Sequence, residues 1–156
     1  MRTTEAAAPA TRGCDWHKRV KGRKRHLLVD TLGLLLRVVV TAANMQDKAG
    51  ALLALSRLGG AGKKLRRVWA DGAYRTEQGH LAAWVARHRV ALTPVRRPEG
   101  QRGFQVLPRR WVVERTFSWL YQSRRLNTDY ERLPETSETL IYIAMTRLML
   151  RRLAPK

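Results

Sequence analysis

Two carboxylates in this sequence occupy positions that suit chemistry on phosphate esters. Asp71 directly follows the apolar run at residues 65–70 and precedes Gly72, so its carboxylate is expected where a strand ends. Open α/β sheets place ligand sites at that carboxyl edge. An Asp-Gly pair is equally typical of an ordinary turn, and this alternative stays open for Asp71 taken alone.

Glu114 lies in a segment predicted to form an amphipathic helix over residues 109–126. When the residues are placed at 100° intervals around the helix axis, the face that carries Glu114 is polar and the opposite face is apolar. Glu114 therefore projects from a helix whose other face is anchored in the core. A solvated helix face with an Arg110 to Glu114 pair explains the same pattern without a functional site. The residues that share the face of Glu114 are Arg110, Ser118, Tyr121 and Arg125.

Together, Asp71 and Glu114 offer the oxygen ligands that Mg²⁺ (or Mn²⁺) takes from a few carboxylates, with water and phosphate completing its shell. Two such ions support phosphoryl transfer, because one activates the attacking oxygen and the other stabilises the leaving oxygen. Such a site normally needs more than two carboxylates. A zinc site at Cys14, His17 and His26 is not favoured, because four ligands at metal spacing are not available.

The elements that must position these residues alternate between strand-like and helix-like patterns. Two β-rich runs flank a turn in which Gly33 supplies a positive φ, which predicts a β-hairpin. The order of elements predicts an α/β fold with a mixed sheet flanked by helices. The expected elements are strands at 26–30 and 34–41, a helix from Asn44 or Asp47 to about 58 that stops at glycines 59–62, a strand at 65–70, a helix capped by Thr76, a strand at 90–93 closed by Pro94, a basic loop at 95–108, and helices at 109–126 and from Pro134 or Thr136 to 153.

The length of 156 residues suits one domain. Residues 1–15 lack apolar periodicity, so we assign no element there and set a flexible lead-in at 1–17, with the domain at 18–156. A single cysteine cannot form an internal disulfide, and no signal-like run begins the chain. The longest apolar stretch, 140–150, is too short to span a bilayer. We therefore expect a cytoplasmic, nucleoid-associated protein without a membrane partner.

The charge is strongly unbalanced, with 31 Lys and Arg against 12 Asp and Glu and a formal net charge of +19. Such an excess indicates a polyanionic partner, and nucleic acid is the default because basic side chains displace condensed counterions from phosphates. Six of the eight residues at 18–25 are basic. The predicted DNA contacts are Lys21, Arg23, Lys24, Arg25, Arg96, Arg97, Arg124 and Arg125.

From about residue 18 to residue 153 the sequence resembles the bacterial DDE transposases of the insertion-sequence four and five type. The resemblance implies a ribonuclease-H-like fold in which Asp71 is the second catalytic Asp, Glu114 the catalytic Glu and Arg110 the signature Arg. Asp71 and Glu114 would then hold Mg²⁺ or Mn²⁺. The similar motifs are residues 21–26 (KGRKRH) leading to Val29 and Asp30, residues 42–44 (AAN) with Asp47, residues 70–74 (ADGAY) and, most specific, residues 110–120 (RWVVERTFSWL).

The sequence also departs from this family. The family signature is a Tyr, an Arg three positions later, a Glu four positions after the Arg, and a Lys seven positions after the Glu. In this sequence Leu107 stands at the Tyr position and Tyr121 at the Lys position. The cationic contact of the missing Lys is therefore expected to pass to Arg125. The family's first catalytic Asp lies on a strand upstream of the basic run, and residues 1–7 are similar to the segment just after it. The first strand is therefore expected to be missing. Asp15, in a loop, and Asp30, in the hairpin turn, are poor substitutes.

The resemblance implies DNA transposition by metal-dependent strand cleavage and transfer. The chain would then be the downstream half of a split or truncated enzyme, with an upstream N-terminal half as a partner and several copies assembling on DNA. The alternative is a catalytically inactive DNA-binding remnant, which the absent first Asp favours. A structural nucleic-acid-binding protein, such as a ribosomal component, explains the charge but not the arrangement of Asp71 and Glu114.

Overall fold

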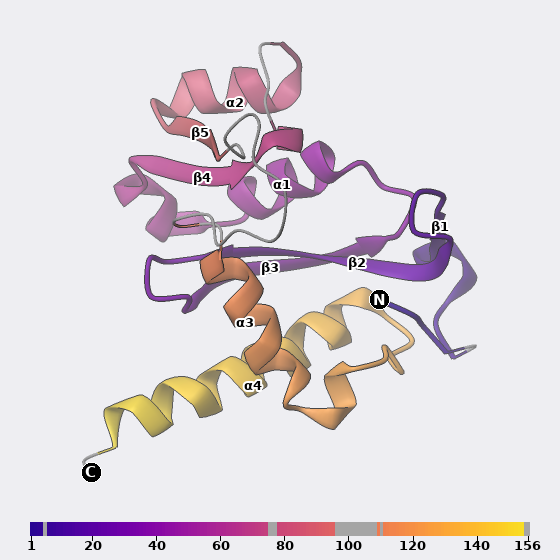
Figure 1. The fold of residues 1–156 in the computed structure, drawn as a ribbon. Coiled ribbons are helices and arrows are strands. Elements are labelled where there is room, and N and C mark those ends of the chain that lie inside the picture. Colours follow the sequence, from indigo (N-terminus) through magenta and orange to yellow (C-terminus); the bar gives the residue numbers. More distant parts are fainter. Residues whose placement is uncertain (5, 75–77, 96–108, 110, 155–156) are drawn as a thin grey trace, which may run out of the picture.

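The computed structural model describes residues 1–4, 6–74, 78–95, 109 and 111–154. These residues form an antiparallel three-stranded sheet, a parallel two-stranded sheet and four α-helices (Figure 1). The strands are β1 (Gly13–Asp15), β2 (Val20–Val29), β3 (Leu35–Ala42), β4 (Arg67–Asp71) and β5 (Ala91–Val95), and the helices are α1 (Asp47–Ser56), α2 (His80–His88), α3 (Trp111–Tyr121) and α4 (Pro134–Leu153). The predicted α/β class is confirmed.

The hairpin of β2 and β3 is the longest pairing in the structure and confirms the predicted hairpin. Its register runs from Arg23 opposite Ala42 to Val29 opposite Leu35. In the turn, the Asp30 carboxylate accepts hydrogen bonds from the backbone N–H groups of Leu32 and Leu34, both at 2.8 Å. Strand β2 begins six residues before the predicted start at His26, because its first residues pair with β1 and those from Arg23 onward pair with β3, which outweighs the low strand propensity of Lys and Arg.

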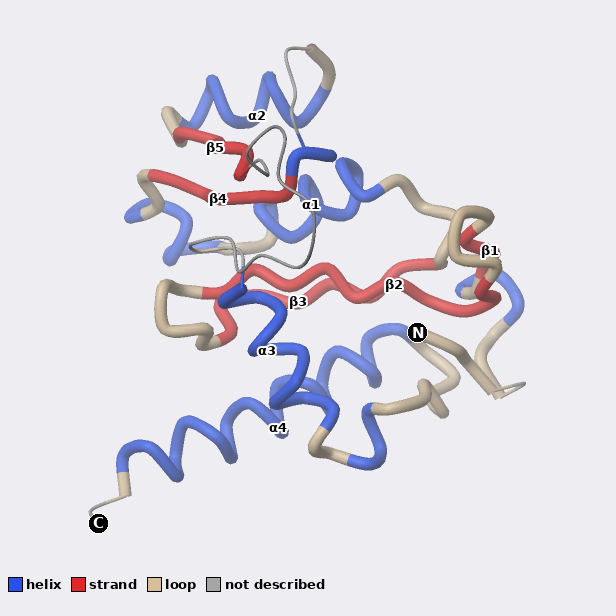
Figure 2. The backbone as a smooth tube through the Cα atoms, in the orientation of Figure 1, coloured by secondary structure: helices blue, strands red, loops and turns tan. Residues whose placement is uncertain are grey.

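Two hydrophobic cores lie on opposite sides of this hairpin, because alternate residues of a strand face opposite ways. Leu27 and Val29 pack into the core that β3 forms with α3 and α4, while Leu28 packs into the core of α1, α2, β4 and β5. Figure 2 shows the hairpin between these two groups of elements. Side chains of α4 also cover the edge of β3, where Val40 N–H donates to Glu138 Oε1 at 2.8 Å and Val38 N–H donates to the Tyr142 hydroxyl at 3.2 Å.

The single mixed sheet predicted from the sequence is not formed by the described residues. Strand β4 pairs in parallel with β5 alone, and this pair is separate from the sheet of β1, β2 and β3. Pro94 does not close β5 as predicted, but lies within it opposite Ala70. An edge strand tolerates proline, since one of its sides needs no N–H donor.

The N-terminal residues differ most from the sequence prediction, which assigned no element to residues 1–15. Strand β1 pairs antiparallel with β2, from Gly13 opposite Gly22 to Asp15 opposite Val20. The Met1 ammonium donates to the Arg23 carbonyl at 3.0 Å, and Arg23 N–H donates to the Met1 carbonyl at 3.1 Å. The predicted absence of structure is wrong, because backbone pairing with an available strand needs no apolar periodicity.

Two helix boundaries also differ from the predictions. Helix α3 ends at Tyr121, five residues before its predicted end, because Ser123 adopts an extended backbone and the chain then forms a 3-10 turn at Arg124–Leu126. Helix α1 begins at Asp47, with Gln46 as the N-cap residue. The predicted cap at Thr76 lies outside the described residues. None of the described helices has the length and apolar character needed to cross a membrane.

Candidate functional site

Asp71 is the last residue of β4, as predicted, and it is exposed. It lies in register with Val95 at the end of β5, so both parallel strands finish at the same edge. Trp69 lies two residues earlier and therefore points to the same face of β4 as Asp71. The chain turns immediately afterwards in a 3-10 turn at Gly72–Tyr74.

Glu114 is exposed in the first turn of α3, on the face that the sequence pattern assigned to it. The other face of α3 buries Val112, Thr116 and Leu120. Thr116 Oγ1 lies 2.9 Å from the Gly33 carbonyl and 3.0 Å from the Val112 carbonyl, and it can donate to either. This contact to the hairpin turn fixes how far α3 is rotated about its axis and hence the direction of Glu114.

The residue after Glu114 adds a second connection to the same turn. Arg115 Nη2 donates to the Leu32 carbonyl at 2.8 Å. Its guanidinium lies over the rings of Trp111, at 4.2 Å, and Trp119, at 4.7 Å. Helix α3 is therefore held by polar and cation-π contacts as well as by its apolar face.

A cation-π contact joins the start of α3 to β4. The Arg109 guanidinium lies 4.4 Å from the centre of the Trp69 ring. Arg109 lies two residues before the start of α3, so this contact places the segment that leads into the helix of Glu114 beside β4, the strand that ends at Asp71. The sequence analysis missed it, since no sequence signal links residues 69 and 109. Whether the two carboxylates meet at one metal ion stays a prediction.

A further acid lies near the turn after Asp71. Burial, together with the negative charges of Asp47 and Asp71, raises the pKa of Tyr74 to about 12. Asp47 itself pairs with Lys24 at 3.0 Å. The sequence analysis placed Asp47 only at a helix start and in a family motif, so its position beside Tyr74 is a new feature of the site.

No three His, Cys, Asp or Glu residues come together as a metal site within the described part of the chain. Asp15 accepts hydrogen bonds from the N–H groups of His17 and Lys18, both at 3.2 Å. The Lys18 N–H is the main reason that the pKa of Asp15 lies below its usual value. Asp30 is engaged in the hairpin turn. Both acids thus have local structural roles, and the absence of the first catalytic Asp stays a prediction.

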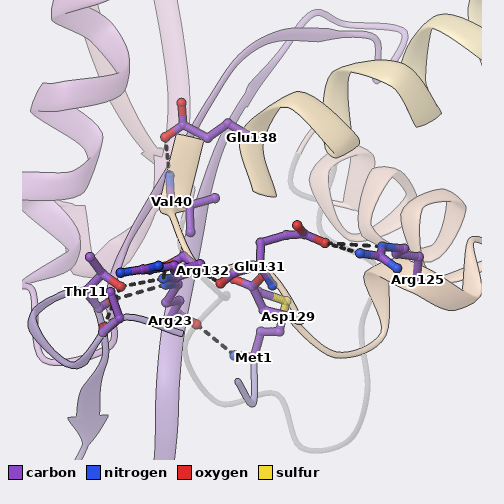
Figure 3. Close-up of polar contacts among 10 residues, drawn as sticks. Met1, Thr11, Arg23, Val40, Arg125, Asp129, Glu131, Arg132 and Glu138 are labelled. Carbon is purple, nitrogen blue, oxygen red and sulfur yellow. Dashed lines mark hydrogen bonds and ion pairs between the residues drawn. The ribbon is translucent and has the colours of Figure 1, made fainter. Parts of the chain in front are cut away.

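Arg23 was predicted to contact DNA, and this prediction is wrong. Its side chain is 0% exposed and pairs with the buried Asp129 at 3.0 Å. It also donates to the backbone carbonyls of Thr11, Glu131 and Arg132 (Figure 3). A guanidinium with all these acceptors is a structural group, and it cannot reach a phosphate.

The other predicted DNA contacts have different surroundings. Lys21 and Arg124 are exposed. Lys24 pairs with Asp47 and donates to the Met45 carbonyl at 3.0 Å. Arg125 pairs with Glu131 at 2.7 Å, which uses part of its charge. Arg25 is only partly exposed, and Arg96, Arg97 and the signature Arg110 lie outside the described residues.

Comparisons with known proteins identify the family of this chain. Residues 1–149 match the model of the transposase DDE domain family. The chain is 35% identical over 118 residues to the transposase assigned to insertion sequence element IS402 of Burkholderia cepacia, covering 71% of this chain and 54% of that protein. It thus spans about half the length of this curated relative, and no solved structure matches it. The family match over most of the chain, together with an exposed Asp at a strand end and an exposed Glu on an anchored helix, shows that this protein belongs to the bacterial insertion-sequence DDE transposases.

Proposed function

We propose that this chain is the catalytic portion of a metal-dependent enzyme that cuts and joins DNA during transposition, with a ribonuclease-H-like fold. The observation that carries the proposal is the contact of Arg109 with Trp69, since it lies between the segment just before the helix of Glu114 and the strand that ends at Asp71. Family membership supports the same assignment.

The residues at this edge fit a hard divalent cation. Asp71 and Glu114 are exposed carboxylates on two well-anchored elements, and their oxygens are the ligands that Mg²⁺ and Mn²⁺ prefer. We propose that these two residues hold the metal, which would activate the attacking oxygen and stabilise the leaving oxygen when bound. By resemblance, Arg110 would contact a DNA phosphate beside Glu114.

A third carboxylate is needed, and we propose that it arrives on an added strand that also completes the sheet. Among the described residues, 24–29 of β2 pair on one side only and β4 pairs only with β5. Met1 and Arg2 already lie antiparallel to Arg23 and Gly22. A strand that continues this pairing would run along β2. We propose an upstream N-terminal half as its source.

The test is strand transfer with a terminal-repeat duplex and Mg²⁺ or Mn²⁺, using the chain alone and the chain fused to its upstream reading frame. We expect no transfer by the chain alone and transfer by the fusion. Asp71→Asn and Glu114→Gln should each abolish it, while Glu135→Gln, an exposed acid of α4, should not. Transfer by the unfused chain that Glu114→Gln abolishes would instead show that Asp15 or Asp30 completes the site.

A second candidate function is DNA binding without catalysis. It is favoured by the lack of a three-acid group in the described residues. Both functions predict salt-sensitive DNA binding with little sequence preference, acting in the cytoplasm and with several copies on one DNA. A fusion that binds DNA but does not cut it under any metal would select the second candidate.

A further inference from the structure

Two arginines on the same face of β2 have opposite surroundings. Arg23 and Arg25 are two residues apart, so both side chains point toward α3 and α4. Every nitrogen of the Arg23 guanidinium has an acceptor. In Arg25, by contrast, Nε and Nη1 are buried and have no hydrogen-bond partner among the described residues.

The nearby carboxylate cannot serve Arg25, because Asp129 is already committed. Its Oδ2 accepts from Arg23 at 3.0 Å and its Oδ1 accepts from the Glu131 N–H at 3.1 Å. The Met1 ammonium adds another positive charge: burial lowers its pKa, and the charge of Arg25 lowers it further. Three cationic groups thus surround one acid.

Buried donors without acceptors destabilise a folded protein, so the two unbonded nitrogens of Arg25 need an explanation. Burial lowers the pKa of Arg25, and only Asp129 and Tyr121 oppose this effect. Tyr121 lies at the exposed end of α3, the helix that carries Glu114 and contacts β2. Arg25 is partly exposed, so its guanidinium, with Nε and Nη1 unbonded, lies near the surface between β2 and α3.

We propose that Arg25 is a phosphate-binding residue whose missing acceptor is a phosphate of the DNA backbone, bound between β2 and the end of α3. The proposal rests on the proposed function of the chain in acting on DNA. Arginine suits this task, since its planar guanidinium can donate two parallel hydrogen bonds to one phosphate. Phosphate is favoured over a carboxylate because the chain carries a net charge of +19.

This assignment predicts opposite effects on stability and binding. Arg25→Met keeps the apolar stem and removes the unpaired charge, so the melting temperature of the free chain should rise. DNA affinity should fall about tenfold, because a charge-assisted hydrogen bond is lost. The slope of log affinity against log salt should become shallower by about one. Arg23→Met should do the reverse for stability and lower the melting temperature strongly.

The experiment measures melting temperature, and DNA affinity at several salt concentrations, for the full chain and for Arg25→Met, Arg25→Lys and Arg124→Gln. Arg124 is exposed, so its loss should weaken DNA binding without stabilising the chain. Arg25→Lys keeps the charge and loses the planar donor pair, so it should bind DNA more weakly than the unchanged chain. If Arg25→Met does not fold, the comparison of Arg25→Lys with the unchanged chain still tests the role of Arg25.

The outcomes separate this inference from the proposed function. If the unchanged chain binds no DNA at low salt, the proposed function fails. If it binds DNA and the Arg25 variants bind equally well, only the role of Arg25 fails. If these variants keep DNA affinity but weaken binding of an upstream-half peptide, the acceptor belongs to a protein strand, and the phosphate assignment is overturned.

Discussion

Loss of the buried Arg23 side chain should be the most damaging change to a single charged residue in this domain. Arg23→Gln removes the ion-pair and hydrogen-bond partner of Asp129, whose side chain is 1% exposed. Breaking one side of a buried ion pair typically costs about 3–5 kcal/mol. In a domain of this size each kcal/mol lowers the melting temperature by roughly 2–4 °C, so we expect a fall of about 6–20 °C.

The contacts of Arg23 explain why this value should lie in the upper part of the range. Its Nη1 donates to the Glu131 carbonyl at 2.9 Å and its Nη2 to the Arg132 carbonyl at 2.8 Å, so the loop before α4 loses donors as well (Figure 3). Its Nε donates to the Thr11 carbonyl at 3.1 Å, which ties the N-terminal segment to the same group. One substitution therefore loosens three segments together.

The assay is thermal unfolding followed by circular dichroism for Arg23→Gln, Asp129→Asn and the double variant. Because the two residues interact directly, the double variant should lose less stability than the sum of the single losses. The matched control is Arg125→Gln, whose pair with Glu131 is exposed on the Arg125 side at 63%. This surface pair should contribute no more than about 1 kcal/mol. Equal melting temperatures for Arg23→Gln and Arg125→Gln would refute the argument.

The remaining predictions concern the two cores and the turn beside Asp71. Gly50→Ala should lower the free energy of unfolding by about 1–3 kcal/mol, because the added Cβ would collide with the ring of His26. This cost should exceed the gain from the higher helix propensity of alanine. A variant that is more stable in urea unfolding would contradict the close packing. In the folded chain, burial lowers the pKa of His26 below its usual value of 6.5. The unfolded chain therefore takes up the proton at a higher pH than the folded chain does. Stability should then decline as the pH drops from about 6.5 through the folded pKa, and His26→Gln should flatten that decline in urea titrations; an unchanged slope rejects the assignment. Thr116→Val should cost about 1–3 kcal/mol, because the Gly33 carbonyl loses its donor, and an unchanged urea midpoint would argue against the contact. In an ultraviolet pH titration, Tyr74→Phe should remove the component that ionises near pH 12. If it removes a component near pH 10 instead, Tyr74 is exposed to solvent and its assigned burial is wrong.

The sequence by itself determined the parts of this protein that depend on neighbouring residues. The hairpin follows from two β-rich runs and the Asp30 to Gly33 turn, and the structure confirms it. The spacing of apolar residues over 111–121 also predicted which face of α3 carries Glu114. Local backbone preference and periodicity suffice for such features, because their partners lie within a few residues along the chain.

Only the tertiary structure decided what each basic residue does. Lys21, Arg23 and Arg25 belong to one basic run, yet the first is exposed, the second is buried and fully paired, and the third is partly exposed with two buried nitrogens that lack an acceptor among the described residues. The partner of Arg23 is Asp129, 106 residues away. A charge run therefore predicts a polyanionic partner for the whole domain, but not which of its residues make the contact.

The same distinction holds for the candidate site. Residue type and spacing selected Asp71 and Glu114, whereas the contact between Trp69 of β4 and Arg109, just before α3, appeared only in the tertiary structure. Strand β1 likewise formed where the sequence showed no apolar period, because β2 offered backbone groups to pair with. Burial and pairing depend on which distant segments the fold brings into contact, and no pattern within a single segment contains that information.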